Sequence, residues 1–276
     1  MVAPRDSQRP IREIASPANA LLKVFRHALA EGVTRDGLLA VEGPFLVEEA
    51  LKANERAVVH SVVVAKANEG KFGALLARLP REAEIAAVPG DIFLKIAQTE
   101  NPQGIAALVE LRKEKLESLL ARRDTLLLVA CGLQDPGNLG TMMRSAQAFG
   151  ASALITLEGT VSPFNPKAVR ASAGAVFHLP VFEGLETEPL FRQLRKADVR
   201  IIAADRHSSQ SLADADLRGS LAILVGQEAA GLPPAISRQA DSLLSIPIRE
   251  GMNSMNAAVA ASIFLYEAAR QRGFLH

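Results

Sequence analysis

Short apolar runs alternate with segments of helical period along this chain, and that alternation limits its possible folds most strongly. In the second half, the sequence predicts strands at residues 125–131, 153–157, 176–181, 199–204, 221–225 and 243–246. The helices predicted among them cover residues 139–149, 165–173, 188–196, a short segment from 233, and 257–271. Strands that alternate with helices pair in parallel, because each connection crosses over the sheet. We therefore expect an α/β fold with a mostly parallel sheet.

The first half carries a smaller α/β pattern of its own. Its predicted strands are residues 38–41, 61–65, 84–88 and 105–111, and its predicted helices are 18–30, 44–53, 72–79 and 92–97. The segment that follows, 112–123, is charged and favours a helix. We predict one domain over residues 1–111, a linker over 112–123 and a second domain over 124–276. An alternative stays open, in which 112–123 is a surface helix of one larger domain.

Composition and charge exclude several classes of protein. Of the 276 residues, 49% are hydrophobic, which is enough for a sizeable core. The net charge is +1, so charge alone indicates no nucleic-acid-binding domain, and an aromatic content of 4% argues against recognition dominated by base stacking. No apolar run approaches the roughly 20 residues of a membrane helix. Residues 1–10 contain no hydrophobic secretion signal.

Cysteine and histidine positions point away from metal and thiol chemistry. Cys131 is the single cysteine and lies in an apolar run, so we expect a buried residue rather than a nucleophile. Because one cysteine forms no internal disulfide, a reducing cytoplasm is the expected compartment. The histidines lack metal-ligand spacing, so we predict no metal site and ordinary surface or boundary positions for residues 27, 60, 178, 207 and 276.

Three polar segments follow predicted strands in the second half, and the first runs from residue 133 to 150. Its Asp135-Pro-Gly-Asn138 stretch has turn chemistry, and Asn138 is a candidate cap for the following helix. Arg144 lies about 100° around the helix from Met143, so it points off the packed face. A guanidinium there can clamp a phosphate or stabilise an oxyanion. The alternative is a solvated helix arginine.

The other two segments combine a strand end with a turn. The strand 221–225 runs into Gly226, and Glu228 stands just beyond it, at the edge where open α/β sheets bind ligands. A glutamate that starts a helix is the alternative. In the third segment, Pro247 ends sheet pairing, and Ser254 and Asn256 are residues that accept bonds at a helix start. By itself this segment is also consistent with an ordinary capped helix.

Taken together, the three segments resemble the motifs of the SpoU/TrmH-like (SPOUT) family of RNA ribose 2′-O-methyltransferases. In the first segment, the residues that match the family motif are Asn138-x-Gly140-x-x-x-Arg144-x-Ala146-x-x-Phe149-Gly150. In the second segment they are Gly226-x-Glu228-x-x-Gly231-Leu232, and in the third they are Ile246-Pro247-x(6)-Ser254-x-Asn256. Order and spacing agree over residues 124–271. The sequence departs from the family pattern at Glu250, Asn253 and Met255, while the serine and the asparagine stay in register.

Two further similarities extend the resemblance. Residues 165–174, Asn-Pro-Lys-Ala-Val-Arg-Ala-Ser-Ala-Gly, are similar to another block of the family. In the first half, residues 45–51 and 102–105 are similar to the small ribosomal-protein-like (L30e-like) domain that often precedes the methyltransferase domain and binds the RNA substrate. The resemblance thus implies an RNA substrate-binding domain over residues 1–111.

Several expectations follow from the resemblance alone. It implies that the parallel sheet of the second domain ends in an α/β trefoil knot, that S-adenosylmethionine is the methyl donor, and that the protein is a homodimer. Positions that match the family's donor-binding residues are Gly226, Ile246, Met255 and Asn256. Positions that match its catalytic and site-shaping residues are Arg144, Asn138, Glu228, Ser254 and Asn256.

The implied reaction is methylation of a ribose 2′-hydroxyl in RNA, and the extra first domain favours 23S-type ribosomal RNA as the substrate. The enzyme must orient that hydroxyl in line with the methyl group. Because a guanidinium hardly deprotonates, we prefer Arg144 as an electrostatic stabiliser of the developing alkoxide rather than as the base. Methylation of transfer RNA, an inactive RNA-binding homologue and a small-molecule transferase are the alternatives.

Overall fold

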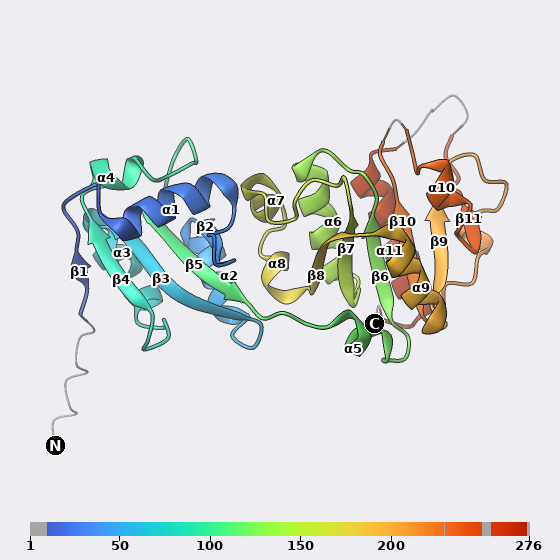
Figure 1. Ribbon diagram of the computed structural model, residues 1–276, viewed down its shortest axis with the longest axis horizontal. Coiled ribbons are helices and arrows are strands. Elements are labelled where there is room, and N and C mark those ends of the chain that lie inside the picture. Colours follow the sequence, from blue (N-terminus) through green and yellow to red (C-terminus); the bar gives the residue numbers. More distant parts are fainter. Residues whose placement is uncertain (1–9, 229, 250–254, 275–276) are drawn as a thin grey trace, which may run out of the picture. The chain divides into compact units, whose positions relative to one another are not determined.

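The computed structural model of the chain describes residues 10–228, 230–249 and 255–274. The chain separates into two compact units, with the boundary between Arg112 and Lys113 (Figure 1). The predicted linker 112–123 contains helix α5 (Leu116–Leu120), whose leucines are buried in the core of the second unit. Ser254 and Glu250 lie outside the described residues, and so does most of the segment in which the family pattern departs.

The first unit is built on a mixed sheet with the strand order β1-β4-β3-β5-β2. The strands are β1 (Arg12–Glu13), β2 (Leu39–Glu42), β3 (Ala57–Ala65), β4 (Glu84–Val88) and β5 (Ile105–Leu111). The helices are α1 (Ala20–Glu31), α2 (Pro44–Lys52), α3 (Glu69–Leu76) and α4 (Gly90–Leu94), and a 3₁₀ turn (Lys66–Asn68) precedes α3. Strand β5 pairs antiparallel with both β2 and β3, whereas β4 pairs parallel with β1 and β3.

The second unit carries a six-stranded sheet with the order β11-β9-β10-β6-β7-β8. Its strands are β6 (Leu126–Ala130), β7 (Ala153–Leu157), β8 (Val181–Leu185), β9 (Arg200–Ala204), β10 (Leu221–Val225) and β11 (Ser242–Leu244). Every pairing between these described strands is parallel, as the sequence predicts. In such a sheet all carboxyl ends lie at one edge, so the loops after β6, β9, β10 and β11 emerge together.

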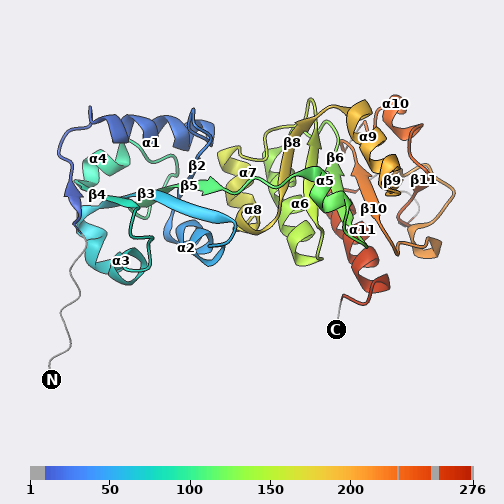
Figure 2. The same ribbon diagram turned by 60° about the horizontal axis from the view of Figure 1, so that its bottom comes forward.

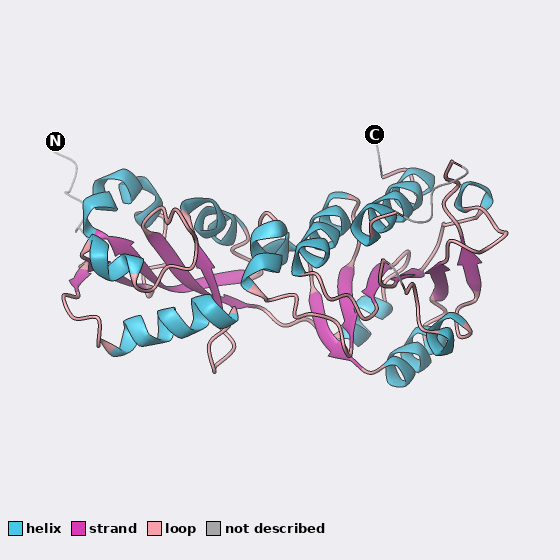
Figure 3. Ribbon diagram, turned by 90° about the horizontal axis from the view of Figure 1, so that it is seen from above, coloured by secondary structure: helices cyan, strands magenta, loops and turns pink. Residues whose placement is uncertain are grey.

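Helices cover both faces of this sheet (Figure 3). They are α5, α6 (Pro136–Ala148), α7 (Pro166–Ala171), α8 (Ala175–His178), α9 (Thr187–Lys196), α10 (Pro234–Ser237) and α11 (Ala257–Gln271), with a 3₁₀ turn at Leu212–Asp214. On one face, α5 and α9 bury their apolar side chains against β6, β7, β9 and β10. Helices α6 and α11 pack against each other, as their neighbouring positions in Figure 2 show.

Two expectations about local structure were wrong. The run 176–181 is not a strand: residues 175–178 form the one-turn helix α8 and β8 begins only at Val181. A short apolar run has no period that separates a buried turn of helix from a strand, and α8 is buried against α6. Asn138 does not cap α6, because Asp135 is the N-cap and accepts a bond from the amide of Gly137 over 2.9 Å. The trefoil knot stays a prediction, because residues 250–254 lie outside the described part of the chain.

Candidate active site

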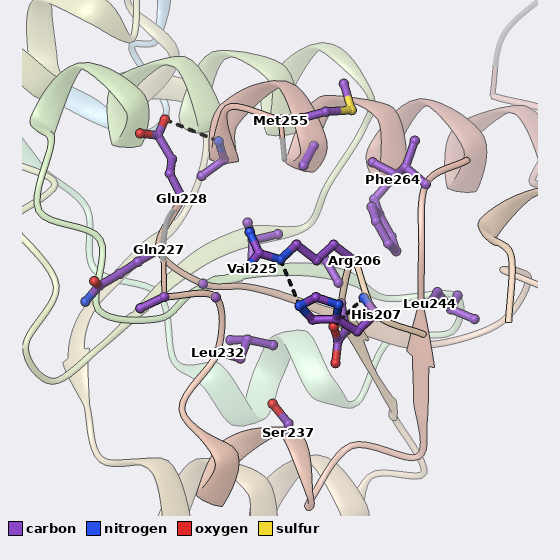
Figure 4. Close-up of a pocket in the computed structure, with 18 of the residues that line it drawn as sticks. Arg206, His207, Val225, Gln227, Glu228, Leu232, Ser237, Leu244, Met255 and Phe264 are labelled. Atoms are coloured by element: carbon purple, nitrogen blue, oxygen red, sulfur yellow. Dashed lines mark hydrogen bonds between the residues drawn. The ribbon is translucent and has the colours of Figure 1, made fainter. Parts of the chain in front are cut away.

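A cavity of about 230 Å³ lies at the carboxyl edge of the second sheet. It is lined by the ends of β9, β10 and β11 and by the first turns of α11 (Figure 4). Of the four positions that match donor-binding residues of the family, Gly226, Ile246 and Met255 line it, whereas Asn256 is not among its lining residues. Glu228 stands at its rim as well. The cavity therefore brings together residues from Ala204 to Phe264, which are 60 positions apart in the sequence.

Gly226 lies where the chain turns back on itself after β10. Its neighbour Gln227 and Gly231 exchange backbone hydrogen bonds of 3.0 and 2.8 Å, which close a tight loop. A Cβ at position 226 would lie 2.3 Å from the carbonyl oxygen of Gly231, closer than side-chain carbons approach backbone. A glycine is required here because the returning backbone fills the space of a side chain, and the absence of that side chain leaves the floor of the cavity as bare backbone.

Glu228 connects the three motif segments through its carboxylate. Its Oε1 accepts a hydrogen bond from Nδ2 of Asn138 over 2.9 Å and another from Nδ2 of Asn256. Asn256 also donates to Oδ1 of Asn138 over 2.9 Å, which closes a ring of three side chains. The backbone amide of Ala257 lies 3.4 Å from the same Oε1 atom. A carboxylate at the N-terminus of α11 is further favoured by the helix dipole.

Asn256 has a second task, since it is the N-cap of α11. Its Oδ1 accepts from the amides of Ala258 and Val259 over 2.9 and 3.2 Å, as expected from the sequence. The side chain thus uses its oxygen for the helix and its nitrogen for the ring of three. On α6 these two tasks are divided, because Asp135 caps the helix and Asn138 is left to bind Glu228.

Arg144 is exposed on α6, with the apolar stripe of the helix on the opposite side. The stripe is fully buried and consists of Leu139, Met142, Met143 and Ala146. Among the described residues, Arg144 is not part of the cavity lining and has no hydrogen-bond partner. The structure therefore groups Asn138, Glu228 and Asn256 but leaves the arginine apart from them within one chain.

Sequence reasoning missed one wall of the cavity, the loop after β9. Asp205, Arg206 and His207 line it there, and His207 is exposed, as expected for a surface or boundary residue. The available signal was the position of this polar run directly after a strand of the parallel sheet. No strand or helix pattern identifies which strand ends are neighbours, so the run remained unassigned.

Two ionisable groups near the site have shifted pKa values. A hydrogen bond from Lys167, followed by one from the backbone amide of Gly137, lowers the pKa of the Asp135 carboxyl below its usual 3.8. Burial raises the pKa of the Cys131 thiol to about 12. Cys131 is thus a buried thiol, as predicted from its place in an apolar run, and its surroundings disfavour the thiolate.

Neither metal ligation nor a membrane span is visible in the described part of the chain. No three or more His, Cys, Asp or Glu side chains group there in a way that would hold a metal ion. None of the helices found there combines the length and the apolar character needed to cross a membrane.

Comparison with known proteins identifies the family. The domain family described as SpoU rRNA Methylase matches residues 125–266, about half of the chain. The chain belongs to the SpoU methylase family. A second domain family, described as RNA 2′-O ribose methyltransferase substrate binding, matches residues 40–114. The two matches fall on the two compact units of this SpoU-family protein.

Individual SpoU-family proteins are similar over nearly the whole chain. The 23S rRNA (guanosine(2553)-2′-O)-methyltransferase RlmP of Bacillus subtilis strain 168 is 32% identical over 93% of this chain and 98% of its own length. The 23S rRNA (uridine(2479)-2′-O)-methyltransferase of Streptomyces viridochromogenes is 32% identical over 73% of this chain and 72% of its own. The AdoMet-bound rRNA methyltransferase from Sinorhizobium meliloti superposes with a TM-score of 0.81 at 30% identity, covering 94% of this chain and 98% of its own.

Proposed function

We propose that this SpoU-family protein transfers the methyl group of S-adenosylmethionine to a ribose 2′-hydroxyl of 23S-type ribosomal RNA. The observation that carries the proposal is the convergence of the three motif segments on one cavity, with Glu228 bonded to both Asn138 and Asn256. The named activities of the similar proteins from Bacillus and Streptomyces support ribosomal RNA as the substrate class.

The cavity fits the proposed methyl donor in shape and chemistry. Its floor at Gly226 is bare backbone, held by the loop to Gly231, which suits recognition of a nucleoside through backbone groups. Apolar side chains of Ile246, Met255 and Phe264 supply walls for a planar ring. We assign donor binding to Gly226, Ile246, Met255 and Asn256. The sulfonium methyl group of the bound donor is a strong electrophile that needs no further activation.

The chain's own residues then have to position and activate the ribose hydroxyl. We assign stabilisation of the developing alkoxide to Arg144, whose guanidinium stays charged. Glu228 is a positioning residue, because its Oε1 is occupied by the two asparagine amides. Asn138 and Asn256 shape the site through the same ring. We assign Ser254 to the site from its motif position alone.

The location of Arg144 supports a homodimer. The guanidinium lies outside the cavity lining of its own chain. In a homodimer, the Arg144 side chain of one copy would reach the reacting groups in the cavity of the other copy. The neighbouring helix α11 presents Val259 and Tyr266 with 46% and 47% of their surfaces exposed, seven residues apart and so on one face. A second copy packed on α6 and α11 would bury these two side chains.

The first unit is proposed to bind the RNA, over the domain 1–111 that precedes the linker. The substrate-binding family match at residues 40–114 supports this assignment. Phe45, at the start of α2 and within that match, has 56% of its surface exposed and offers a ring on which a base can stack. We also infer that the protein acts in the cytoplasm, which suits a chain whose one cysteine is a buried thiol.

A labelling experiment tests the proposed function directly. The protein is incubated with tritium-labelled S-adenosylmethionine and with ribosomal RNA, transfer RNA or no RNA, and the RNA is hydrolysed in alkali. Ribose methylation protects the adjacent phosphodiester, so label is expected in alkali-resistant dinucleotides from ribosomal RNA. Label in mononucleotides would indicate base methylation, and no label with any RNA would overturn the proposal.

A further inference from the structure

A carboxylate that no family motif covers lines the cavity at the end of β9. Asp205 directly follows this strand and is half-buried. Among the described lining residues, it and Glu228 are the two that carry a carboxylate. The Glu228 carboxylate already accepts from both asparagine amides through Oε1. Asp205 is therefore the carboxylate of the cavity to which the proposed reaction assigns no role.

Asp205 occupies the middle of three neighbouring strand ends. Strand β9 lies between β10 and β11 in the sheet, and its Ala203 pairs with Leu224 of β10. The same register, continued for two residues, places Asp205 beside Gly226, with neighbouring strands about 4.8 Å apart. On the other side, the amide of Asp205 donates to the carbonyl oxygen of Leu244 in β11 over 2.9 Å. Asp205 therefore stands between the two chain segments, after β10 and after β11, to which we assign binding of the methyl donor.

Hydrogen bonds fix the orientation of this side chain and leave part of its acceptor capacity unused. Oδ1 of Asp205 accepts from the backbone amide of His207 over 2.8 Å. The carbonyl oxygen of Asp205 accepts from the amide of Ser208 over 3.2 Å, which holds the turn. Among the described residues, Oδ2 has no hydrogen-bond partner. Because an ionised carboxylate offers about four lone-pair sites, Asp205 can accept further hydrogen bonds from a ligand.

The order of the strands decides which part of S-adenosylmethionine reaches Asp205. The ring of three joins Glu228, after β10, to Asn138, after β6, on the side of β10 that faces away from β9. Figure 4 correspondingly shows Glu228 and His207 well apart in the cavity. The transferred methyl group and the amino-acid chain are both bonded to the sulfur, which must lie near the ring for the reaction. The nucleoside is then the part that extends toward Asp205.

A ribose matches the acceptor that Asp205 provides. Its 2′- and 3′-hydroxyls are neutral groups on adjacent carbons, and a carboxylate can accept hydrogen bonds from both. An acidic side chain near a strand end binds a ribose hydroxyl in a comparable way in dinucleotide-binding α/β sheets. We propose that Asp205 binds the 2′,3′-diol of the adenosine part of S-adenosylmethionine. The inference rests on the proposed function and deepens it, because it names the residue that selects a ribonucleoside.

Isothermal titration calorimetry of the full chain with three ligands tests the inference. The ligands are S-adenosylhomocysteine, 5′-methylthioadenosine, which lacks the amino-acid part, and the 2′-deoxy form of 5′-methylthioadenosine. Asp205→Ala is expected to weaken the first two alike, about tenfold to a hundredfold, the usual cost of losing a hydrogen bond to a charged group. Removal of the 2′-hydroxyl should cost affinity in the unaltered protein and little in Asp205→Ala, because the two changes remove the same contact.

Two further variants separate this contact from its surroundings. Asp205→Asn keeps an oxygen for the His207 amide but lacks the charge, so affinity for the first two ligands should fall less, about threefold to tenfold. Asp214→Ala removes an exposed carboxylate that lies outside the cavity lining, between β9 and β10, and it should change none of the affinities.

The possible failures are distinguishable. Weakening of S-adenosylhomocysteine alone by Asp205→Ala would indicate a contact with the α-ammonium group and overturn the ribose assignment. The same conclusion would follow from no weakening of any ligand, or from a penalty for the missing 2′-hydroxyl that is as large in Asp205→Ala as in the unaltered protein. Each of these results leaves the proposed function in place. If the unaltered protein bound neither S-adenosylhomocysteine nor 5′-methylthioadenosine, the donor site itself, and with it the proposed function, would fail.

Discussion

Nδ2 of Asn138 lies 2.9 Å from Oε1 of Glu228, although 90 positions separate the two residues. One residue belongs to the first turn of α6, after β6, and the other follows β10. Since β6 and β10 are neighbours in the parallel sheet, their carboxyl ends deliver the two side chains to one place. The order of the strands in the sheet therefore determines which side chains meet in the candidate active site.

Glu228→Ala should lower the rate of methyl transfer more than it lowers donor affinity. The substitution removes Oε1, which accepts from both asparagine amides, so the ring of three cannot form. We expect kcat/KM to fall about a hundredfold, as for the loss of a site-positioning hydrogen bond. Steady-state methylation assays and donor titrations measure the two effects. Glu183→Ala, at an exposed position on β8, is the matched control, and a fully active Glu228→Ala protein would contradict the ring's role.

Substitution of Arg144 should separate the two possible roles of its guanidinium. If the side chain stabilises the alkoxide, Arg144→Lys retains part of the rate and Arg144→Ala loses about a hundredfold or more. The shape of the pH–rate profile should be the same in Arg144→Lys and in the unaltered enzyme, because arginine itself contributes no titration near neutral pH. A single-turnover rate that is unaffected in Arg144→Ala would remove the residue from catalysis.

Gly226→Ala should destabilise the second unit as well as the donor site. The added Cβ would lie 2.3 Å from the Gly231 carbonyl oxygen, so the returning loop must move. Overpacking of this kind typically costs about 1–3 kcal/mol in the free energy of unfolding. Urea denaturation measures the cost. Gly70→Ala is the control, since a Cβ at that helical position meets no atom within 4 Å and should be neutral or stabilising.

The stability of the protein should depend on pH through Asp135. Its pKa is lowered in the folded state, first by the hydrogen bond from Lys167 and next by the Gly137 amide. A lowered carboxyl pKa contributes stability that is complete above the unfolded value of 3.8 and is lost as the pH falls through the lower folded value. Asp135→Asn keeps a capping oxygen without the charge. Melting temperatures of the two proteins should therefore differ at neutral pH and converge in acid, and a gap that widens in acid would refute this assignment.

The sequence predicted most of the strands that position the site. Strands β7 and β10 of the second unit have the bounds expected from their apolar runs, and so do β4 and β5 of the first unit. The two-residue strand β1 was missed, since it is exposed and too short to show a period. The strand predicted at residues 176–181 was wrong, because apolar character alone does not distinguish a buried helical turn from a strand.

The site itself was predictable only where it lies in a motif. Gly226, Ile246 and Met255 line the cavity as the resemblance implies, whereas the loop with Arg206 has no motif and became visible only through the pairing of β9 with β10 and β11. The cap of α6 was assigned three residues too late, because Asn138 and Asp135 have equal capping chemistry and only the structure shows which side chain reaches Glu228.

The double use of Asn256 has a consequence for biosynthesis. Its oxygen caps the last helix and its nitrogen completes the ring at Glu228, so the ring closes only when α11 is in place. During translation, β6, α6 and β10 leave the ribosome well before residues 257–271 do. A nascent chain that has folded its sheet therefore still lacks the third member of the ring. The ring at Glu228 therefore forms only after the segment that carries Asn256 and α11 has left the ribosome.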